Sequence, residues 1–313
     1  MKKTLVLASV IFSILLLTAC GDREDSDSEK SADNKLQVVT SFTVLKDMAE
    51  QIGGDYVEVH NLVPTGTEPH DYEPVPEDNK QAADADVLLY NGLNLEGGED
   101  GWFFKMIDAV GQDESHVFSA SKGIEPLYIG GGDHKTEQNP HDFIDPDNGL
   151  KMAANIRDAL IEADPDREDA YKQQGDEFMD RLKEVEQDYD QKLGNIPEED
   201  RILVTSERSY QYLADHYGFK EGYLYEIDTQ ENGTPEQIKD LVAFIEKNAP
   251  PALFVESNHD KRPMKTVSNE SGVPIYDKPI YSGEIGAQGE EADTYIKYLN
   301  YNLDVIYTGL TDN

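Results

Sequence analysis

The sequence has little positive charge and one cysteine. Its 313 residues hold 27 Lys and Arg against 64 Asp and Glu, a formal net charge of −37. Such a chain lacks the basic face of a nucleic-acid-binding protein, and it is unsuited to electrostatic docking on an anionic membrane. The lone cysteine, Cys20, excludes an intrachain disulfide. Most of the acidity is expected at the solvated surface, and a cation ligand is the other interpretation.

Motifs typical of hydrolases and nucleotide-binding enzymes are absent as well. The sequence contains no His-Glu-x-x-His, no Gly-x-Ser-x-Gly and no Gly-rich phosphate loop. A metallohydrolase would also need an open metal position with a water and a nearby base. We therefore predict that the protein is not an enzyme, and a metallohydrolase is the less favoured alternative.

The first twenty residues have the pattern of a processed export signal. Two lysines precede an apolar run from Leu5 to Leu17, which is short for a membrane span and leads through Thr and Ala into Cys20. With a glycine after it, Leu-Thr-Ala-Cys resembles the lipobox of bacterial lipoproteins. This implies cleavage before Cys20 and a diacylglycerol on its thiol, whereas an ordinary signal followed by an unrelated cysteine is the alternative. We expect the lipid, not charge, to attach the protein to the membrane.

The chain length suggests two domains, because single domains commonly have about 150 residues. Residues 21–34 are almost all polar or small and cannot bury apolar area, so they predict a disordered tether. The predicted organisation is a signal peptide over 1–19, a lipidated tether over 20–34, an N-terminal metal-binding lobe over 35–165, a linking helix over 166–193, and a C-terminal metal-binding lobe over 194–313.

Short apolar runs alternate with helical patterns along the body of the chain. Such a rhythm predicts an α/β fold with two lobes, each a mostly parallel sheet flanked by helices. The predicted strands are 36–39, 57–63, 87–90, 202–205, 223–227 and 252–255. The predicted helices outside the linker are 44–52, 102–110, 210–217, 235–247 and about 292–310.

One long rigid helix is predicted between the lobes. Asp164-Pro165 has the pattern of an N-cap with proline at the first helical position. Apolar residues then recur three, four or seven apart and form one stripe: Tyr171, Phe178, Leu182, Val185, Tyr189 and Leu193. At ~1.5 Å per residue the segment 166–192 would span ~40 Å. A coiled-coil partner helix is the alternative. Lobes of this kind bind ligands at the carboxyl ends of their strands.

Three residues have the chemistry and position of metal ligands. His70 and His141 each follow a proline, which helps to fix the loop, and each stands in a loop rich in carboxylates. Loop histidines are commonly just solvated, but two Pro-His turns between α/β elements favour binding. Glu207 lies just past the strand 202–205, where it is either a ligand or a charge favoured at a helix start. Neutral imidazole suits Mn, Fe or Zn.

Several stretches carry a family resemblance, namely 66–73, 87–96, 139–141, 205–207, 233–237, 262–268 and 289–303. They resemble the TroA-like metal receptors of bacterial ABC importers, which have a helical backbone between two lobes, and particularly the manganese-binding surface lipoproteins of Gram-positive bacteria. The resemblance covers the chain from about Lys35 to its end. It implies that His70 and His141 are ligands, and that Glu207 is the carboxylate of manganese members, where zinc members usually have His.

The fourth ligand of the family is where this sequence departs. Gly283 stands where family members have a ligating Asp, and Glu284 follows it. We predict Glu284 as the substitute, because its longer side chain can reach back and Gly283 gives the backbone freedom to do so. Water alone, or Asp277, are the alternatives. Asn139 likewise replaces the usual Asp before Pro-His, so it can accept a hydrogen bond from an imidazole but adds no charge.

The expected ligand set favours manganese. Two imidazoles and two carboxylates cancel the charge of M²⁺, and carboxylates suit Mn²⁺ or Fe²⁺ better than the His- and Cys-rich sites of zinc. Zinc-type relatives often have a His-rich loop near the second histidine, whereas 130–139 holds only His134. We predict a monomeric, lipid-anchored receptor on the extracytoplasmic face of a Gram-positive cell membrane, with Mn²⁺ as cargo and an ABC permease as partner. A zinc receptor is the main alternative, Fe²⁺ is a further candidate cargo, and a surface adhesin is less favoured.

Overall fold

The computed structural model describes residues 35–130, 137–227 and 233–311. The chain divides into two compact units, 1–34 and 35–313, and the description below concerns the second. The predicted export signal, the lipidation site Cys20 and the tether lie outside the described residues, as does His134. Within the three described ranges, no helix has the length and apolar character needed to cross a membrane.

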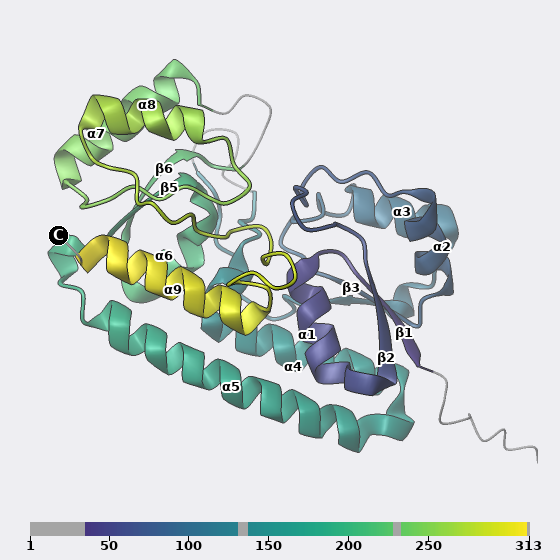
Figure 1. Ribbon diagram of the computed structural model, residues 1–313. Coiled ribbons are helices and arrows are strands. Elements are labelled where there is room, and N and C mark those ends of the chain that lie inside the picture. The colour runs from purple at the N-terminus through teal and green to yellow at the C-terminus, as the bar shows by residue number, and fades with distance from the viewer. Residues whose placement is uncertain (1–34, 131–136, 228–232, 312–313) are drawn as a thin grey trace, which may run out of the picture. The chain divides into compact units, whose positions relative to one another are not determined.

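Four parallel strands form the first sheet, in the order β2-β1-β3-β4, and the first three are labelled in Figure 1. They are β1 (Leu36–Thr40), β2 (Val57–Asn61), β3 (Val87–Tyr90) and β4 (Val117–Ser119). The helices of this part are α1 (Thr43–Gly53), α2 (Pro76–Asp84), α3 (Trp102–Val110) and α4 (Pro146–Ala163). The strand order reverses between β1 and β3. In a parallel α/β sheet this reversal opens a crevice at the carboxyl ends of the strands, where ligands bind.

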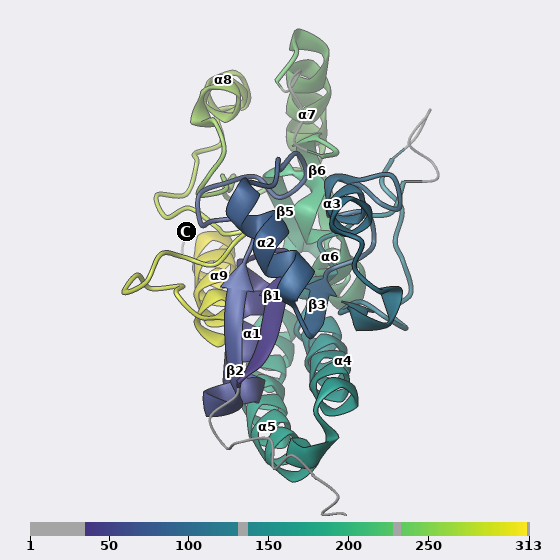
Figure 2. The same cartoon turned by 90° about the vertical axis from the view of Figure 1, so that its right-hand side faces the viewer.

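Helices cover both faces of the first sheet (Figure 2). Successive residues of a strand face opposite layers. Val38 and Leu89 pack in the core that α1, α4 and α5 also supply. Val39 and Leu88 pack on the other side with Phe103 and other residues of α2 and α3. This layering follows from the central strands β1 and β3, which are mostly apolar and mostly buried, as sheets covered on both faces require.

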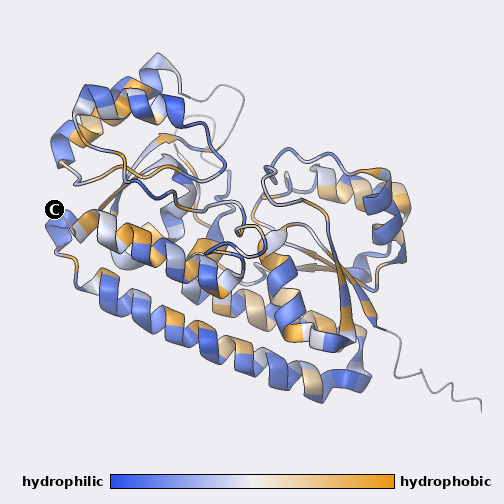
Figure 3. Cartoon of the chain, in the orientation of Figure 1, coloured by the Kyte–Doolittle hydropathy of each residue, from blue (hydrophilic) through white to orange (hydrophobic). Residues whose placement is uncertain are grey.

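The predicted long helix is α5 (Glu168–Gly194), which follows the 3₁₀ turn η5 (Pro165–Arg167). Its buried residues include the whole predicted stripe: Tyr171, Phe178, Leu182, Val185, Tyr189 and Leu193. They contact α1, α4 and α9 (Tyr295–Thr311), and Tyr189 Oη donates a hydrogen bond to the carbonyl of Leu299 at 2.7 Å. Polar residues occupy much of the rest of α5 (Figure 3). The stripe is therefore packed within this chain, which removes the need for a coiled-coil partner.

Helix α4 was not predicted and lies beside α5 in both views. Its start has a clear local cause, because the Asp145 side chain accepts a hydrogen bond from the Asp147 N–H at 2.9 Å and Pro146 occupies the first helical position. Met152, Ile156 and other residues of α4 enter the core. The Asp-Pro pair is the sequence signal that marks this helix.

The second sheet consists of two parallel strands, β5 (Ile202–Glu207) and β6 (Lys220–Tyr225). Its helices are α6 (Gln211–Tyr217), α7 (Pro235–Asn248) and α8 (Lys261–Ser271). The remaining short 3₁₀ turns are η1 (Gly54–Tyr56), η2 (Glu114–His116), η4 (Asp142–Ile144), η6 (Glu198–Asp200) and η7 (Arg208–Tyr210).

The predicted strand over 252–255 is wrong as a regular strand. The segment does lie beside β5, since the Phe254 N–H donates to the carbonyl of Val204 at 2.8 Å. On its other side it makes only isolated bridges, with Ile275 and Ile280. Each of these residues follows a proline, and proline has no N–H with which to continue a ladder. The predicted α/β fold with parallel sheets and a long helix is otherwise present, whereas the predicted lobe boundaries stay predictions.

Candidate metal site

Three predicted ligands from distant parts of the sequence meet in one cluster. His70, His141 and Glu207 each offer a ligand atom, and these atoms all lie within 4.8 Å of one another. His141 Nε2 is 3.6 Å from Glu207 Oε2, and the two imidazole centroids are 5.6 Å apart. His141 and Glu207 are 1% and 2% exposed. Buried imidazole and carboxylate groups this close form a donor set that suits a divalent transition metal.

His70 lies in the loop that follows β2. The preceding residue, Pro69, accepts a hydrogen bond from Trp102 Nε1 at 2.8 Å, which fixes the loop against α3. The imidazole Nδ1 of His70 is 3.2 Å from the carbonyl oxygen of Leu95. A carbonyl oxygen can only accept, so Nδ1 carries the proton and Nε2 keeps its lone pair for a metal.

His141 is held by Asn139, as its position before Pro-His predicted. Asn139 Oδ1 accepts hydrogen bonds from His141 Nδ1 at 2.9 Å and from the His141 N–H at 3.0 Å. Asn139 Nδ2 in turn donates to the carbonyl of Arg208 at 2.8 Å. Burial, together with the nearby imidazoles of His70 and His259, holds the pKa of His141 well below its usual value. The ring is therefore neutral and able to bind a metal through Nε2.

Two buried acids brace the turn that carries His141. Asn91, just after β3, donates from Nδ2 to the carbonyl of Pro140 at 2.9 Å and to Asp142 Oδ1 at 3.1 Å. Glu96 accepts from Ser41 Oγ and from the Asn91 N–H, both at 2.7 Å. Burial raises the pKa of Glu96 to about 7 and that of Asp142 to about 6. These contacts tie the carboxyl ends of β1 and β3 to the loops around the cluster.

Glu207 is the last residue of β5, and a second buried acid fixes its backbone. Glu256 accepts hydrogen bonds from the N–H groups of Glu207 at 3.0 Å and Ser206 at 3.2 Å. Burial alone would raise the pKa of Glu256, but its bonds to His259 and to these N–H groups outweigh burial and leave that pKa below its ordinary value. Glu256 is thus an ionised anchor beneath Glu207.

His259 is a residue that the sequence interpretation did not single out. Its Nε2 lies 3.9 Å from Glu207 Oε2, and its Nδ1 lies 2.9 Å from Tyr225 Oη and 3.5 Å from Glu256 Oε2. It follows the extended segment that runs beside β5. The available signal was therefore a histidine just past the carboxyl end of an apolar run, the same position that marked Glu207.

Glu284, the predicted fourth ligand, is buried but is not part of the three-residue cluster found among the described residues. Its Oε2 accepts a hydrogen bond from the Gly66 N–H, and burial raises its pKa. Asp277, the alternative, is exposed. A Cβ added at Gly283 would meet Pro69 Cδ at 3.6 Å, an ordinary contact. Position 283, where the family resemblance implies an Asp, therefore lies against the residue that precedes His70.

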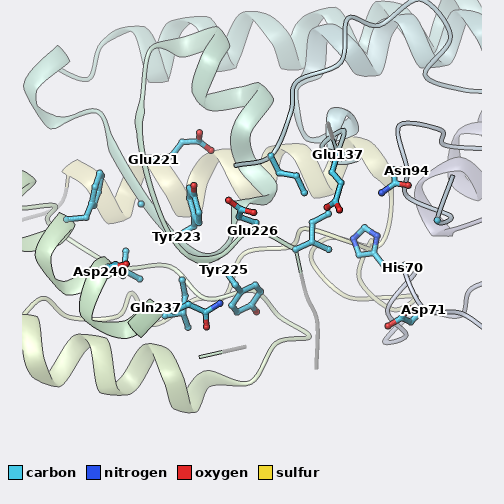
Figure 4. A pocket seen from close by; sticks show the side chains of 17 residues that line it. His70, Asp71, Asn94, Glu137, Glu221, Tyr223, Tyr225, Glu226, Gln237 and Asp240 are labelled. Carbon is cyan, nitrogen blue, oxygen red and sulfur yellow. The ribbon is translucent and has the colours of Figure 1, made fainter. Parts of the chain in front are cut away.

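A cavity of about 930 Å³ reaches His70. Figure 4 shows His70 and Asp71 on one side of it, and Tyr223, Tyr225 and Gln237 from the second sheet and α7 on the other. The cavity is lined by residues from both halves of the chain, so loops from both sheets meet beside the cluster.

Two parallel α/β sheets, a long helix and a buried imidazole–carboxylate cluster at the strand ends define a metal-binding receptor of the helical-backbone type. Residues 38–309 match the family described as ZnuA, zinc-uptake complex component A, periplasmic. The chain belongs to this family. The family consists of substrate-binding receptors, so the predicted resemblance and the prediction that the protein is not an enzyme are both confirmed.

Relatives match along almost the whole chain. The sequence is 39% identical over 311 residues to the metal ABC transporter substrate-binding lipoprotein SsaB of Streptococcus sanguinis, with 99% of each chain covered. It is also 39% identical over 312 residues to the manganese ABC transporter substrate-binding lipoprotein PsaA of Streptococcus pneumoniae, again with 99% of each covered.

Solved structures confirm the fold. A Mn-bound periplasmic metal binding protein from Candidatus Liberibacter asiaticus superposes with a TM-score of 0.77 at 25% identity, over 88% of this chain and 100% of that one. The periplasmic zinc binding protein TroA from Treponema pallidum shares the fold, with a TM-score of 0.80 at 24% identity over 88% of this chain and 99% of that one.

Proposed function

We propose that this protein is the lipid-anchored, extracytoplasmic receptor of an ABC importer, and that it captures one divalent transition metal, with Mn²⁺ favoured. The observation that carries the proposal is the buried cluster of His70, His141 and Glu207, whose ligand atoms lie within 4.8 Å of one another. The lipoprotein relatives named as manganese receptors support it. Glu284 stays the fourth ligand predicted from the sequence, and in this structure its Oε2 accepts a hydrogen bond from the Gly66 N–H.

The two histidines and Glu207 come from opposite halves of the chain, which gives capture a simple mechanism. His70 and His141 follow β2 and β4 of the first sheet, and Glu207 ends β5 of the second. A metal bound to all three would hold these loops together. It would stabilise the conformation in which they meet by its differential affinity for that conformation. The permease would then recognise the loaded protein.

Metal uptake by the stripped protein tests this function. Calorimetric titration is expected to show one Mn²⁺ bound per chain, and His70→Ala or His141→Ala is expected to abolish binding. His116→Ala, which removes an imidazole in η2 away from the cluster, is the matched control and should bind as the wild type does. Absence of uptake by the wild type, or full uptake by a His70→Ala/His141→Ala double variant, would refute the proposal.

Attachment to the membrane is a separate part of the proposal. Cys20→Ser removes the thiol that would carry the lipid, and the net charge of −37 offers no electrostatic substitute. The variant is expected to leave the membrane fraction of cells while retaining Mn²⁺ binding. A Cys20→Ser protein that stays membrane-bound would contradict the anchor without affecting the metal site.

A further inference from the structure

We propose that His259 is a metal ligand of this protein and supplies the fourth protein side chain at the cluster of His70, His141 and Glu207. The inference rests on the proposed metal-receptor function and puts His259 in place of Glu284 as the fourth ligand. His259 has a side chain only 2% exposed, and its Nε2 points at the same oxygen, Glu207 Oε2, that faces His141 Nε2.

Two of the ligand distances are close to those around a shared metal. In a tetrahedral site with bonds of about 2.0–2.1 Å, neighbouring ligand atoms are about 3.4 Å apart. Glu207 Oε2 lies 3.6 Å from His141 Nε2 and 3.9 Å from His259 Nε2. Both contacts are near that spacing. His259 lies outside the group whose ligand atoms are all within 4.8 Å of one another, so its imidazole must also move toward the other two imidazoles for all four side chains to share a metal.

All three imidazoles are presented in the same way. Nδ1 of His70 lies against the carbonyl of Leu95, Nδ1 of His141 against Asn139 Oδ1, and Nδ1 of His259 against Tyr225 Oη and Glu256 Oε2. An acceptor at Nδ1 fixes the ring and leaves the lone pair at Nε2, and a carboxylate in that place also makes the imidazole a stronger donor to a metal. Of the three, His259 is the one with a carboxylate partner among these contacts.

Glu256 explains why His259 and Glu207 are positioned together. The Glu256 side chain is 0% exposed, it accepts hydrogen bonds from the Glu207 and Ser206 N–H groups, and it faces His259 Nδ1. One buried carboxylate therefore holds the backbone of one ligand and the ring of the other. A histidine that served only to neutralise Glu256 would not need its second nitrogen directed at Glu207.

Glu284 has a different partner in this conformation. Its carboxylate accepts the Gly66 N–H from the loop that precedes His70, and the sequence places Gly283 where a shorter carboxylate would have stood against Pro69. Gly283 has no side chain that could bind the metal where the family resemblance implies an Asp. The proposal assigns this coordination position to the side chain that already contacts Glu207. His259 is that side chain.

A third imidazole changes the preference of the site. Three neutral imidazoles and one carboxylate leave a bound M²⁺ with a net charge of +1, whereas two of each leave it neutral. Imidazole-rich sets suit Zn²⁺ and carboxylate-rich sets suit Mn²⁺. His259 is therefore a specificity-determining residue that raises affinity for Zn²⁺ more than for Mn²⁺.

The test titrates the metal-stripped full chain separately with Zn²⁺ and Mn²⁺ in the wild type, His259→Ala, His259→Gln and Glu284→Gln, with His116→Ala as the matched loss of an imidazole elsewhere. X-ray absorption at bound Zn²⁺ counts imidazole ligands independently of affinity. Three are expected in the wild type and two in His259→Ala. Loss of a group that merely orients a ligand costs about 10–100-fold in metal affinity, so loss of a ligand should reach about 100-fold for Zn²⁺ and be smaller for Mn²⁺.

The outcomes separate this inference from the proposed function. The inference is overturned if His259→Ala binds Zn²⁺ within about twofold of the wild type and shows the same number of imidazole ligands. If His70→Ala abolishes binding in the same experiments, the proposed metal-receptor function still stands. If His259→Ala does not fold, His259→Gln is titrated in its place. An X-ray absorption spectrum that shows only two imidazole ligands at Zn²⁺ in the wild type overturns the inference by itself. Weakening by Glu284→Gln but not by either His259 variant also overturns it. Uptake unaffected by His70→Ala would instead refute the metal-receptor function.

Discussion

Asn139→Ala removes the side chain that holds His141 in place, and its effect can be worked out from the contacts. Asn139 is fully buried. Its Oδ1 accepts from His141 Nδ1 and from the His141 N–H, and its Nδ2 donates to the Arg208 carbonyl and to Gln211 Oε1, at distances from 2.8 to 3.0 Å. The substitution therefore removes four hydrogen bonds and unlocks one proposed metal ligand.

The stability cost follows from the number of bonds. A buried hydrogen bond contributes about 1 kcal/mol net, and a buried partner left unpaired adds to that loss. Four bonds then amount to about 4 kcal/mol of unfolding free energy. For a chain of this size a loss of 1 kcal/mol lowers Tm by roughly 2 °C, so Tm should fall by roughly 8 °C. Metal affinity should fall about 10–100-fold, as for other groups that orient a ligand imidazole.

Asn139→Asp is the matched control because it keeps the acceptor and removes the donor. The carboxylate still accepts from His141, so metal binding should be retained or strengthened by the added charge. It has no N–H for the Arg208 carbonyl, and two facing acceptors should cost roughly 2–3 kcal/mol of stability. The two variants therefore separate ligand orientation from the contact with η7.

Calorimetric titration with Mn²⁺ and thermal unfolding of the stripped protein measure both effects. The reasoning requires Asn139→Ala to weaken metal binding and Asn139→Asp to spare it, while both lower Tm. If the two variants bind Mn²⁺ equally well, the hydrogen bond to His141 Nδ1 does not position the ligand. If Asn139→Ala leaves Tm unchanged, the buried bonds to η7 and α6 do not stabilise the fold.

Three further predictions concern separate parts of the molecule. Leu182→Ala, at a fully buried position of α5, should lower the unfolding free energy in urea by about 2–5 kcal/mol; a loss below 1 kcal/mol would mean that the apolar stripe is not part of the core. The hydrogen bond from His216 to Asp145 raises the pKa of His216, so its stabilisation is complete below the unfolded-state pKa of about 6.5 and is lost as pH rises through the higher folded-state pKa. His216→Ala should therefore lower Tm more at about pH 5.5 than at about pH 8.5, and an equal loss at both would show that the pair does not titrate as described. Gly283→Asp adds a carboxylate where a Cβ makes only ordinary contact with Pro69, so it should tighten Mn²⁺ binding about tenfold, equivalent to about 1.4 kcal/mol; unchanged affinity would show that this position does not reach the metal.

Local sequence patterns were sufficient to predict the helices and strands whose buried residues repeat regularly. The stripe of α5 and the apolar runs of β1 and β3 follow helix and strand periods, so the sequence predicts them closely. The segment 252–255 has the composition of a strand, yet prolines in its would-be partner limit the pairing to isolated bridges. Strand pairing depends on the partner segment as much as on the strand itself. The sequence of one apolar segment therefore cannot show whether a regular strand will form.

The candidate site likewise contains residues that the sequence predicts and one that it does not. His70, His141 and Glu207 stand in positions that local rules mark, namely Pro-His turns and the end of a buried strand, and the structure brings them together. His259 lacks such a turn. Its proximity to Glu207 depends on the hydrogen bonds of Glu256 to the end of β5, about fifty residues earlier in the sequence. The position of His259 just past an apolar run was a sequence signal, but its contact with Glu207 arises from the fold.

The hydrogen bond between Glu284 and Gly66 shows how a contact between distant segments can orient a residue that the sequence predicts as a ligand. Glu284 follows Gly283 in the sequence, but its carboxylate accepts a hydrogen bond from Gly66, 218 residues away. His259 is 24 positions before Gly283, yet its Nε2 lies against Glu207. Metal binding depends on which donor atoms surround one point, about 3.4 Å from one another in a tetrahedral site, and not on their distance in the sequence. The proposed role of His259 therefore depends on which side chain the packing directs toward Glu207, and in this chain that side chain is an imidazole.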